Sequence, residues 1–141
     1  MVLDLKILIQ KKIVFYEIGR ARLLNQSKKV LDTVVSALKN HREIIQVRVI
    51  GHTDRTGPYR VNVEVSKLRA RWVRWYLIQN GIDPQRIVMD AKASKDPVAT
   101  NKTKRGRQKN RRTVFQILKW GPVPKKEKPK NEEKHRPTKN R

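Results

Sequence analysis

The stretch GHTDRTGPYRVNVEVSKLRA, residues 51–70, decides the expected fold because two kinds of periodicity meet in it. Before it, residues 45–49 alternate in polarity as a half-buried strand does. Within it, Pro58 favours a turn, and apolar residues then recur at helical spacing over residues 60–80. Gly81 follows, and glycine commonly ends a helix in the left-handed conformation. The stretch therefore predicts a strand, a turn and a long helix.

Weaker patterns on both sides complete the expected order of elements. Alternation near the N-terminus predicts a first strand through Leu3, Leu5, Ile7, Ile9, Ile13 and Phe15. A first helix, capped by Ser27, is indicated by the helical spacing of Val30, Leu31, Val34, Val35 and Leu38. Short strands are expected at residues 87–89 and 113–118, separated by a mostly polar loop over residues 92–111 with room for a helical turn. The order βαβαβ(loop)β predicts the α/β class, as a two-layer α/β sandwich.

Composition changes at residue 121. Residues 121–141 contain eight basic and three acidic residues, a net charge of +5, and Val123 is their only hydrophobic residue. Such a segment cannot bury enough apolar surface to offset the entropy lost on ordering. We therefore expect one folded domain over residues 1–120 and a disordered basic tail over residues 121–141. The domain keeps +18 of the net charge of +23, so the basicity does not come from the tail.

The residue types present restrict the classes of site. The chain has no cysteine, so we expect no disulfide. Its three histidines, His41, His52 and His135, lack the spacing of metal ligands, so we expect no bound metal and no cofactor. No apolar run approaches the about 18 residues that a membrane-spanning helix needs. The N-terminal residues do not have the pattern of a signal peptide. The net charge of +23 predicts association with polyanions.

A polar row interrupts the apolar side of the long helix. At about 100° per residue, Ser66 and Arg69 lie within about 40° of Asn62, in the centre of the apolar arc. A buried guanidinium needs a carboxylate or a bound anion as its partner, and Asp54 in the preceding turn is the nearest candidate. An Asp and an Arg across a crevice suit a zwitterion, since one binds an ammonium and the other a carboxylate. A structural ion pair between the two residues fits the spacing equally well.

Several segments resemble the OmpA-like C-terminal domain family, a peptidoglycan-associated module. GHTDRTGPYRVNVEVSKLRARWV at residues 51–73 is similar to the family's signature. VFYEIGRARL at residues 14–23 is similar to its first strand, and NGIDPQRI at residues 80–87 to the connection after its second helix. DPVATNKTKRGRQKNRRTVFQI at residues 96–117 is similar to its closing segment. The resemblance extends over roughly residues 13–118, in one register.

The resemblance implies non-covalent binding of the peptide stem of peptidoglycan, with diaminopimelate as the central ligand. By position, Asp54 and Arg69 are expected to hold the zwitterionic end of diaminopimelate. The other expected ligand contacts are Thr53, Gly57, Asn62 and Arg111. The resemblance also implies that the chain anchors an envelope protein or assembly to the cell wall. Its basic surface makes anionic envelope polymers or other envelope proteins further expected partners. The expected location is the periplasm, associated with the outer membrane, provided that export information lies outside this chain.

One segment departs from the family's pattern. Ala91, Lys92 and Ala93 stand where the family usually has glycine, an aromatic residue and glycine. Alanine tolerates a positive φ poorly, so this segment is expected either to differ in backbone or to be strained.

Two other function classes compete with wall binding. His52, Asp54 and Ser66 are the residue types of a catalytic triad. No Gly-x-Ser-x-Gly turn presents a nucleophile, however, so we do not expect the chain to be an enzyme. A nucleic-acid or polyanion-binding protein on the same scaffold is favoured by the charge. Trp72, Trp75 and Tyr76 of the long helix could stack on nucleic-acid bases, although Trp72 and Tyr76 are expected in the core.

Overall fold

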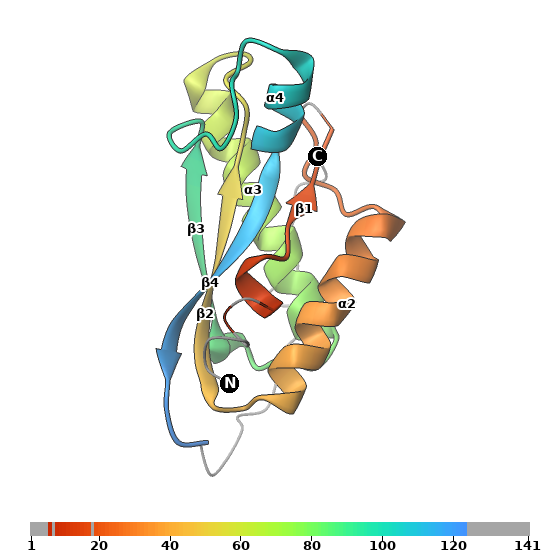
Figure 1. Ribbon diagram of the computed structural model, residues 1–141, viewed down its shortest axis with the longest axis vertical. Coiled ribbons are helices and arrows are strands. Elements are labelled where there is room, and N and C mark those ends of the chain that lie inside the picture. The colour runs from red at the N-terminus through yellow and green to blue at the C-terminus, as the bar shows by residue number, and fades with distance from the viewer. Residues whose placement is uncertain (1–5, 7, 18, 124–141) are drawn as a thin grey trace.

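The computed structural model describes residues 6, 8–17 and 19–123, and Figure 1 shows how their helices and strands are arranged. The elements are β1 (Val14–Phe15), α2 (Asn25–Asn40), β2 (Ile44–His52), α3 (Tyr59–Gln79), the 3-10 turn η1 (Pro84–Arg86), β3 (Ile87–Ala93), α4 (Lys104–Asn110) and β4 (Arg112–Trp120). Within this part of the chain, four strands form one sheet in the order β1-β4-β2-β3. Strands β2 and β3 are parallel, and the other neighbours are antiparallel. The predicted α/β class and element order are confirmed.

The helices α2 and α3 form a second layer against one face of the sheet (Figure 1). Helix α3 packs on β2 and β3, and α2 packs on α3 and β1. The core between the layers contains alternate residues of the strands, among them Val47 and Val49 of β2 and Phe115 and Ile117 of β4. The alternation leaves the intervening residues of both strands on the opposite face of the sheet.

The two layers approach each other closely at Gly51, near the end of β2. A Cβ atom on this residue would lie 2.0 Å from the carbonyl oxygen of Ser66 in α3. Any side chain here would force the helix away from the strand, so glycine sets the distance between them. This contact holds the turn after β2 next to the polar row of α3.

Two ends of the long helix follow the expected chemistry. Gly81 has a φ of 102° and donates its N–H to the carbonyl of Ile78. The N–H of Ile82 bonds to the carbonyl of Leu77, which completes a Schellman motif. Pro58 is the N-cap residue of α3 and has no side-chain cap. The predicted turn at Pro58 and the predicted glycine cap are both confirmed.

The predicted first strand is mostly wrong. Residues 6 and 8–10 are helical, and only Val14 and Phe15 pair with β4. The helical turn buries Ile9 and brings Gln10 to β4, where its Oε1 accepts the N–H of Ile117 at 3.0 Å. The Gln10 side chain thus accepts a backbone N–H of β4 that a longer β1 would otherwise have to accept. The predicted strand residues Leu3, Leu5 and Ile7 lie outside the described residues.

Two further local predictions are corrected. Helix α2 begins at Asn25 with Leu24 as its N-cap residue, so Ser27 is buried in the first turn and does not cap the helix. The expected loop over residues 92–111 contains the end of β3 and the whole of α4. Helix α4 is capped by Thr103, whose side chain accepts the N–H of Gly106.

The boundary of the expected tail stays a prediction, because residues 124–141 lie outside the described residues. Among the helices described by the structure, none combines the length and the apolar character needed to cross a bilayer.

Candidate ligand-binding site

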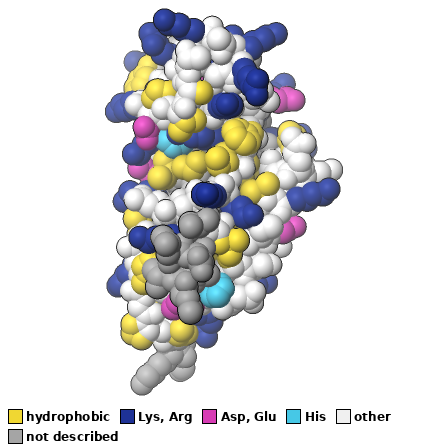
Figure 2. Space-filling view, viewed as in Figure 1, with side chains coloured by type: hydrophobic (Ala, Val, Ile, Leu, Met, Phe, Trp, Pro, Cys, Tyr) yellow, Lys and Arg dark blue, Asp and Glu magenta, His cyan; other side chains and the backbone are white. Residues whose placement is uncertain are grey.

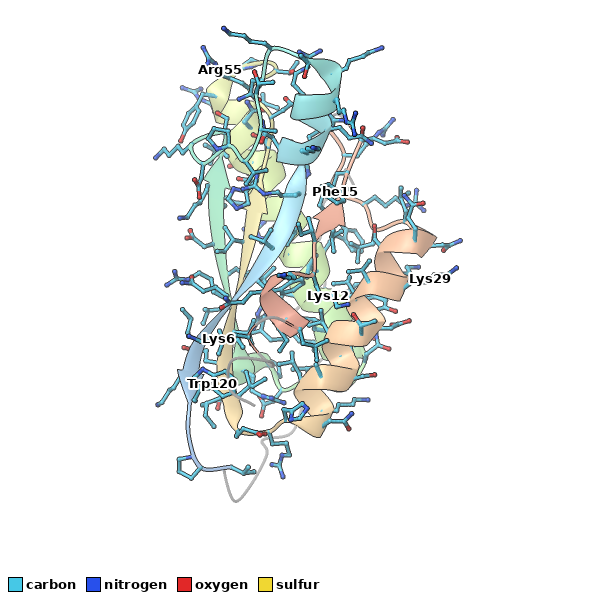
Figure 3. All side chains as sticks on the ribbon, viewed as in Figure 1. Lys6, Lys12, Phe15, Lys29, Arg55 and Trp120 are labelled. Carbon is cyan, nitrogen blue, oxygen red and sulfur yellow. The ribbon has the colours of Figure 1, made fainter. Side chains whose placement is uncertain are left out.

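The predicted site residues gather at the carboxyl end of β2. The turn between β2 and α3 carries three of them, α3 carries two, and one directly precedes β4: Thr53, Asp54, Gly57, Asn62, Arg69 and Arg111. Figure 3 labels Arg55 in this turn, at the same end of the molecule as α4. The side chains of Asp54 and Arg111 are 5% and 12% exposed, and Arg69 has no exposed surface.

The Asp54 carboxylate is held by two donors. Its Oδ2 accepts a hydrogen bond from Nη1 of Arg111 at 2.9 Å, and its Oδ1 accepts the N–H of Thr56 at 2.7 Å. Burial alone raises the pKa of the Asp54 carboxyl, but the bonds from Arg111 and Thr56 outweigh burial and keep its pKa below the ordinary value. Asp54 is therefore a fixed carboxylate, and its ion-pair partner is Arg111.

Arg69 is surrounded by backbone oxygens and an aromatic ring. It donates from Nη1 to the carbonyl of His52 at 2.7 Å, from Nε to that of Arg20 at 2.7 Å, and from Nη2 to that of Glu17 at 3.1 Å. Its guanidinium carbon lies 4.6 Å from the centre of the Tyr16 ring. The sequence predicted a carboxylate or a bound anion as the partner of this guanidinium. In the structure its partners are instead three backbone carbonyl oxygens and the face of an aromatic ring.

The charges of the site do not balance. Burial lowers the pKa of Arg69 to about 10, Tyr16 and Asp54 act in the opposite direction, and Arg111 lowers it further. Asp54 thus lies near two guanidiniums, and only Arg111 forms an ion pair with it. One acid near two bases leaves an excess positive charge at Arg69.

Tyr16 is a site residue that the sequence analysis missed. Besides its ring contact with Arg69, its carbonyl accepts a hydrogen bond from Nε of Arg111 at 2.8 Å. Its hydroxyl lies 2.9 Å from Oγ1 of Thr113, and burial raises its pKa to about 12. Tyr16 therefore fixes both arginines. In the sequence, the signal that could have indicated this role is that Tyr16 directly follows the predicted first strand.

One predicted residue has a buried polar atom without a partner. The Oγ1 atom of Thr53 accepts or donates no hydrogen bond within the described part of the chain. Buried polar groups normally have partners. The Thr53 hydroxyl, next to Asp54 in the same turn, is therefore placed to bind a ligand. Asn62 lies in the first turn of α3, is 7% exposed, and donates its backbone N–H to the carbonyl of Pro58.

Gly57 and α4 shape the edge of the site. Gly57 is exposed and has a φ of 79°, which a side chain would strain. Across from it, Oδ1 of Asn101 accepts the N–H of Arg55 at 3.2 Å and is itself held by Nδ2 of Asn110 at 3.0 Å. The buried Asn110 therefore connects α4 to the turn after β2.

The segment that departs from the family's pattern is the end of β3, and it is strained, which is one of the two expected outcomes. Ala93 has a φ of 50° and is 1% exposed. Its N–H donates to Oγ of Ser66 at 3.2 Å, and its carbonyl accepts the N–H of Thr53 at 2.8 Å. These bonds hold the alanine in a conformation that favours glycine.

The residue types of a triad do not form one in the structure. Ser66 Oγ donates to the carbonyl of Val63 at 2.9 Å and accepts from the N–H of Ala93, so its partners are backbone groups. Nδ1 of His52 has no partner in the described part of the chain. Among the residues that the structure describes, no three side chains converge as metal ligands either.

The chain matches a known protein family. The sequence profile described as the OmpA family matches residues 15–111. Outer membrane protein A of Bordetella avium is 33% identical over 104 residues, which cover 74% of this chain and 53% of that protein. Peptidoglycan-binding protein ArfA of Mycobacterium tuberculosis is 35% identical over 97 residues, which cover 69% of this chain and 29% of that protein. The chain therefore spans about half or less of these relatives.

Solved structures share the two-layer fold. The peptidoglycan-associated lipoprotein from Burkholderia pseudomallei matches with a TM-score of 0.70 at 24% identity, over 75% of this chain and 91% of that chain. The cell wall anchor of the T6SS from Pseudomonas aeruginosa matches with a TM-score of 0.65 at 25% identity, over 76% of this chain and 79% of that chain.

Proposed function

Because this chain belongs to the OmpA family, we propose that it binds peptidoglycan non-covalently and anchors a cell-envelope protein to the wall. Membership of the family confirms the resemblance deduced from the sequence. A peptidoglycan-binding protein and a cell wall anchor are among the similar proteins. The same proposal places the chain in the periplasm or at the outer membrane, and gives it no catalytic role.

We propose the zwitterionic end of diaminopimelate as the group that enters the site. The carboxylate of Asp54 takes the ammonium, and Arg69 attracts the carboxylate, with Arg111 beside it. The observation that carries this assignment is the charge imbalance, one fixed carboxylate near two guanidiniums, with the deeper one lacking an acidic partner. Thr53, Asn62 and the backbone of Gly57 supply the remaining polar contacts.

Direct contact with Arg69 requires a small change in its surroundings, because its side chain has no exposed surface. The ligand carboxylate replaces one of the three carbonyl oxygens. The Glu17 oxygen, at 3.1 Å, forms the longest of the three bonds and is the one most easily replaced.

Co-sedimentation with purified peptidoglycan at physiological salt tests the site. Asp54→Asn removes the charge that holds the ammonium and keeps an acceptor for Thr56, so we expect about tenfold weaker binding or more. Arg71→Ala, an exposed change on the same helix, is the control and is expected to bind like the wild type. Equal binding by Asp54→Asn and the wild type would refute the assignment of the site.

A second comparison tests the ligand group. Peptidoglycan with lysine in place of diaminopimelate keeps the ammonium but lacks the carboxylate beside it. We expect the wild type to bind it much more weakly, and free diaminopimelate to compete with diaminopimelate-type peptidoglycan. Equal binding to both kinds of peptidoglycan would leave wall binding intact and overturn the role of diaminopimelate.

A further inference from the structure

The face of the sheet opposite α2 and α3 carries a groove of about 480 Å³. It is lined by residues of β2 and β4, among them the edge of the core residue Phe115, by residues before and within β1, and by residues of β3, α4 and the loop between them. Most of its surface is apolar, from Ile13, Phe15, Ile50, Val98, Val114 and Phe115. Figure 2 shows this apolar patch on the surface, with lysine and arginine side chains around it.

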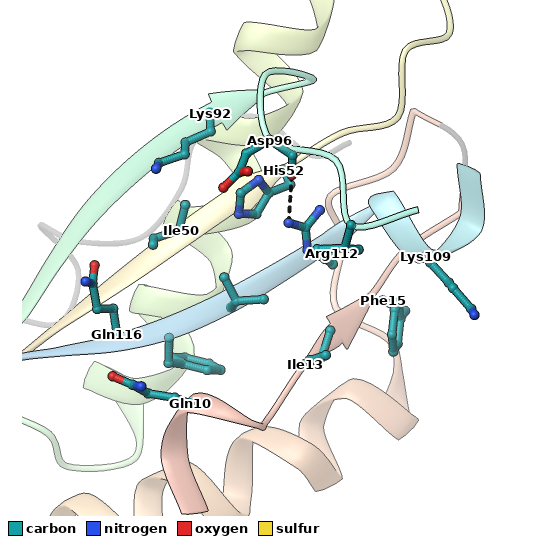
Figure 4. A pocket seen from close by; sticks show the side chains of 13 residues that line it. Gln10, Ile13, Phe15, Ile50, His52, Lys92, Asp96, Lys109, Arg112 and Gln116 are labelled. Carbon is teal, nitrogen blue, oxygen red and sulfur yellow. Dashed lines mark hydrogen bonds between the residues drawn. The ribbon is translucent and has the colours of Figure 1, made fainter. Parts of the chain in front are cut away.

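One buried polar side chain lies in the groove. His52 is 2% exposed, lines the groove, and has no hydrogen-bond partner for Nδ1 within the described residues. Figure 4 shows its ring between Lys92 and Arg112. A buried imidazole nitrogen without a partner is unusual, and a polar group of a ligand in the groove would satisfy it.

The charged residues of the groove are mainly basic. Lys92, Lys109 and Arg112 line it together with a single acid, Asp96. Arg112 is fixed, because it donates to the carbonyl of Asp96 at 2.9 Å and to that of Asn110 at 3.1 Å. The apolar floor is therefore bordered by positive charge, with Lys92 and Lys109 on opposite sides of Arg112 (Figure 4).

We propose that this groove binds a small amphiphile with an apolar body and one acidic head group, a carboxylate, sulfonate or phosphate. Its volume lies within the about 300–1,000 Å³ of small-molecule sites. Charge disfavours two other occupants of this basic groove, because the chain's own residues 121–141 carry +5 and a second copy carries +23. The apolar body fills the floor, and the head group lies near Lys92 and His52, with Lys109 adding positive charge on the other side of Arg112.

This site is separate from the proposed peptidoglycan site. Its lining shares no residue with Asp54, Arg69 or Arg111. His52 connects the two only through its backbone, since its carbonyl accepts from Arg69 while its side chain lines the groove. Failure of one proposal therefore leaves the other intact.

The test uses the full chain and the fluorescent probe 8-anilinonaphthalene-1-sulfonate, an aromatic body with one sulfonate. We expect saturable binding with amide shifts in nuclear magnetic resonance spectra at Ile50, His52 and Val114. The double variant Lys92→Glu/Lys109→Glu is expected to weaken binding about fivefold or more. Lys28→Glu/Lys29→Glu makes the same change of charge on α2, where Lys29 projects outward (Figure 3), and is expected to bind the probe like the wild type.

Two further measurements identify the source of the head group. Monomeric dodecanoate is expected to displace the probe if free amphiphiles fill the groove, and phosphatidylglycerol vesicles if the head belongs to a lipid. Displacement by either supports the proposal. The proposal is overturned if the probe does not bind, if its shifts cluster around Asp54 and Arg111, or if both double variants weaken it equally.

Discussion

Ala93 shows how a single residue stores strain beside the site. Its φ of 50° is left-handed, a region that costs a residue with a side chain about 1–2 kcal/mol. The alanine stays there because its N–H bonds to Ser66 and its carbonyl accepts from Thr53. Thr53 is itself a candidate residue, and Ser66 lies on α3 between Asn62 and Arg69, so the strain is maintained by contacts within the site.

Replacing this alanine should release the strain. We expect Ala93→Gly to raise the free energy of unfolding by about 1 kcal/mol, measured by urea denaturation, because glycine tolerates a positive φ. Ala91→Gly, on the same strand but without a positive φ, is the control and should lower it. A stability loss in Ala93→Gly equal to that of the control would contradict this account.

His52 links stability to pH. Burial, followed by the charge of Arg112, lowers the pKa of its imidazole from 6.5 to about 4. Between pH 6.5 and 4, His52 binds a proton in the unfolded chain but not in the folded chain. The free energy of unfolding therefore falls as pH falls from 6.5 to 4. We expect a loss of about 1–3 kcal/mol over this window, measured by urea denaturation at successive pH values.

The substitution His52→Asn tests that window, because it removes the titrating ring and keeps a polar side chain. Its stability should depend on pH much less steeply than that of the wild type between pH 6.5 and 4.5. Parallel curves for the two proteins would assign the acid sensitivity to other groups.

At the scale of elements, the spacing of apolar residues predicted the long helices α2 and α3. It did not predict α4, which is held by polar side-chain contacts and has no apolar face. Helix α3 and its glycine cap were predicted because apolar spacing and Gly81 act locally. Helix α4 has no apolar stripe, and its buried residues are Gly106 and Asn110. No local pattern predicts a helix whose burial depends on contacts with a distant loop.

The site was predicted to a similar extent. The polar row on α3 indicated that Arg69 is buried, and the structure shows no exposed surface for it. Its partners were not predictable, because the carbonyls of Glu17 and Arg20 lie 52 and 49 residues away in sequence. Backbone oxygens carry no residue-type signal, so only the fold reveals them.

Asn110 provides the test of how α4 supports the site. Its Oδ1 accepts the N–H groups of Val98 and Ala99, and its Nδ2 donates to the carbonyl of Ala99 and to Asn101. We expect Asn110→Ala to lower the free energy of unfolding by about 2–3 kcal/mol and to speed amide exchange at Val98 and Ala99.

The matched control for this element is Gln108→Ala, an exposed change on the same helix that should affect neither quantity. Unchanged exchange at Val98 and Ala99 in the Asn110 variant would mean that the loop does not depend on α4.

At the scale of the whole molecule, the net charge of +23 adds an attraction to any polyanion that must be separated from binding in the site. The two contributions differ in range. Binding through many exposed charges is screened by salt and falls about a thousandfold or more between about 50 and about 200 mM. An ion pair formed in a buried site is screened much less.

Asp54→Asn separates the two contributions because it raises the net charge to +24. If charge alone binds peptidoglycan, this variant should bind at least as tightly as the wild type at every salt concentration. If the site binds it, the variant should lose most of its affinity near 200 mM salt, where the wild type keeps a large part of its own. Sedimentation with peptidoglycan across a salt series measures both curves. Coincident curves that both fall to the baseline would support the polyanion-binding alternative and remove the basis for a role of Asp54.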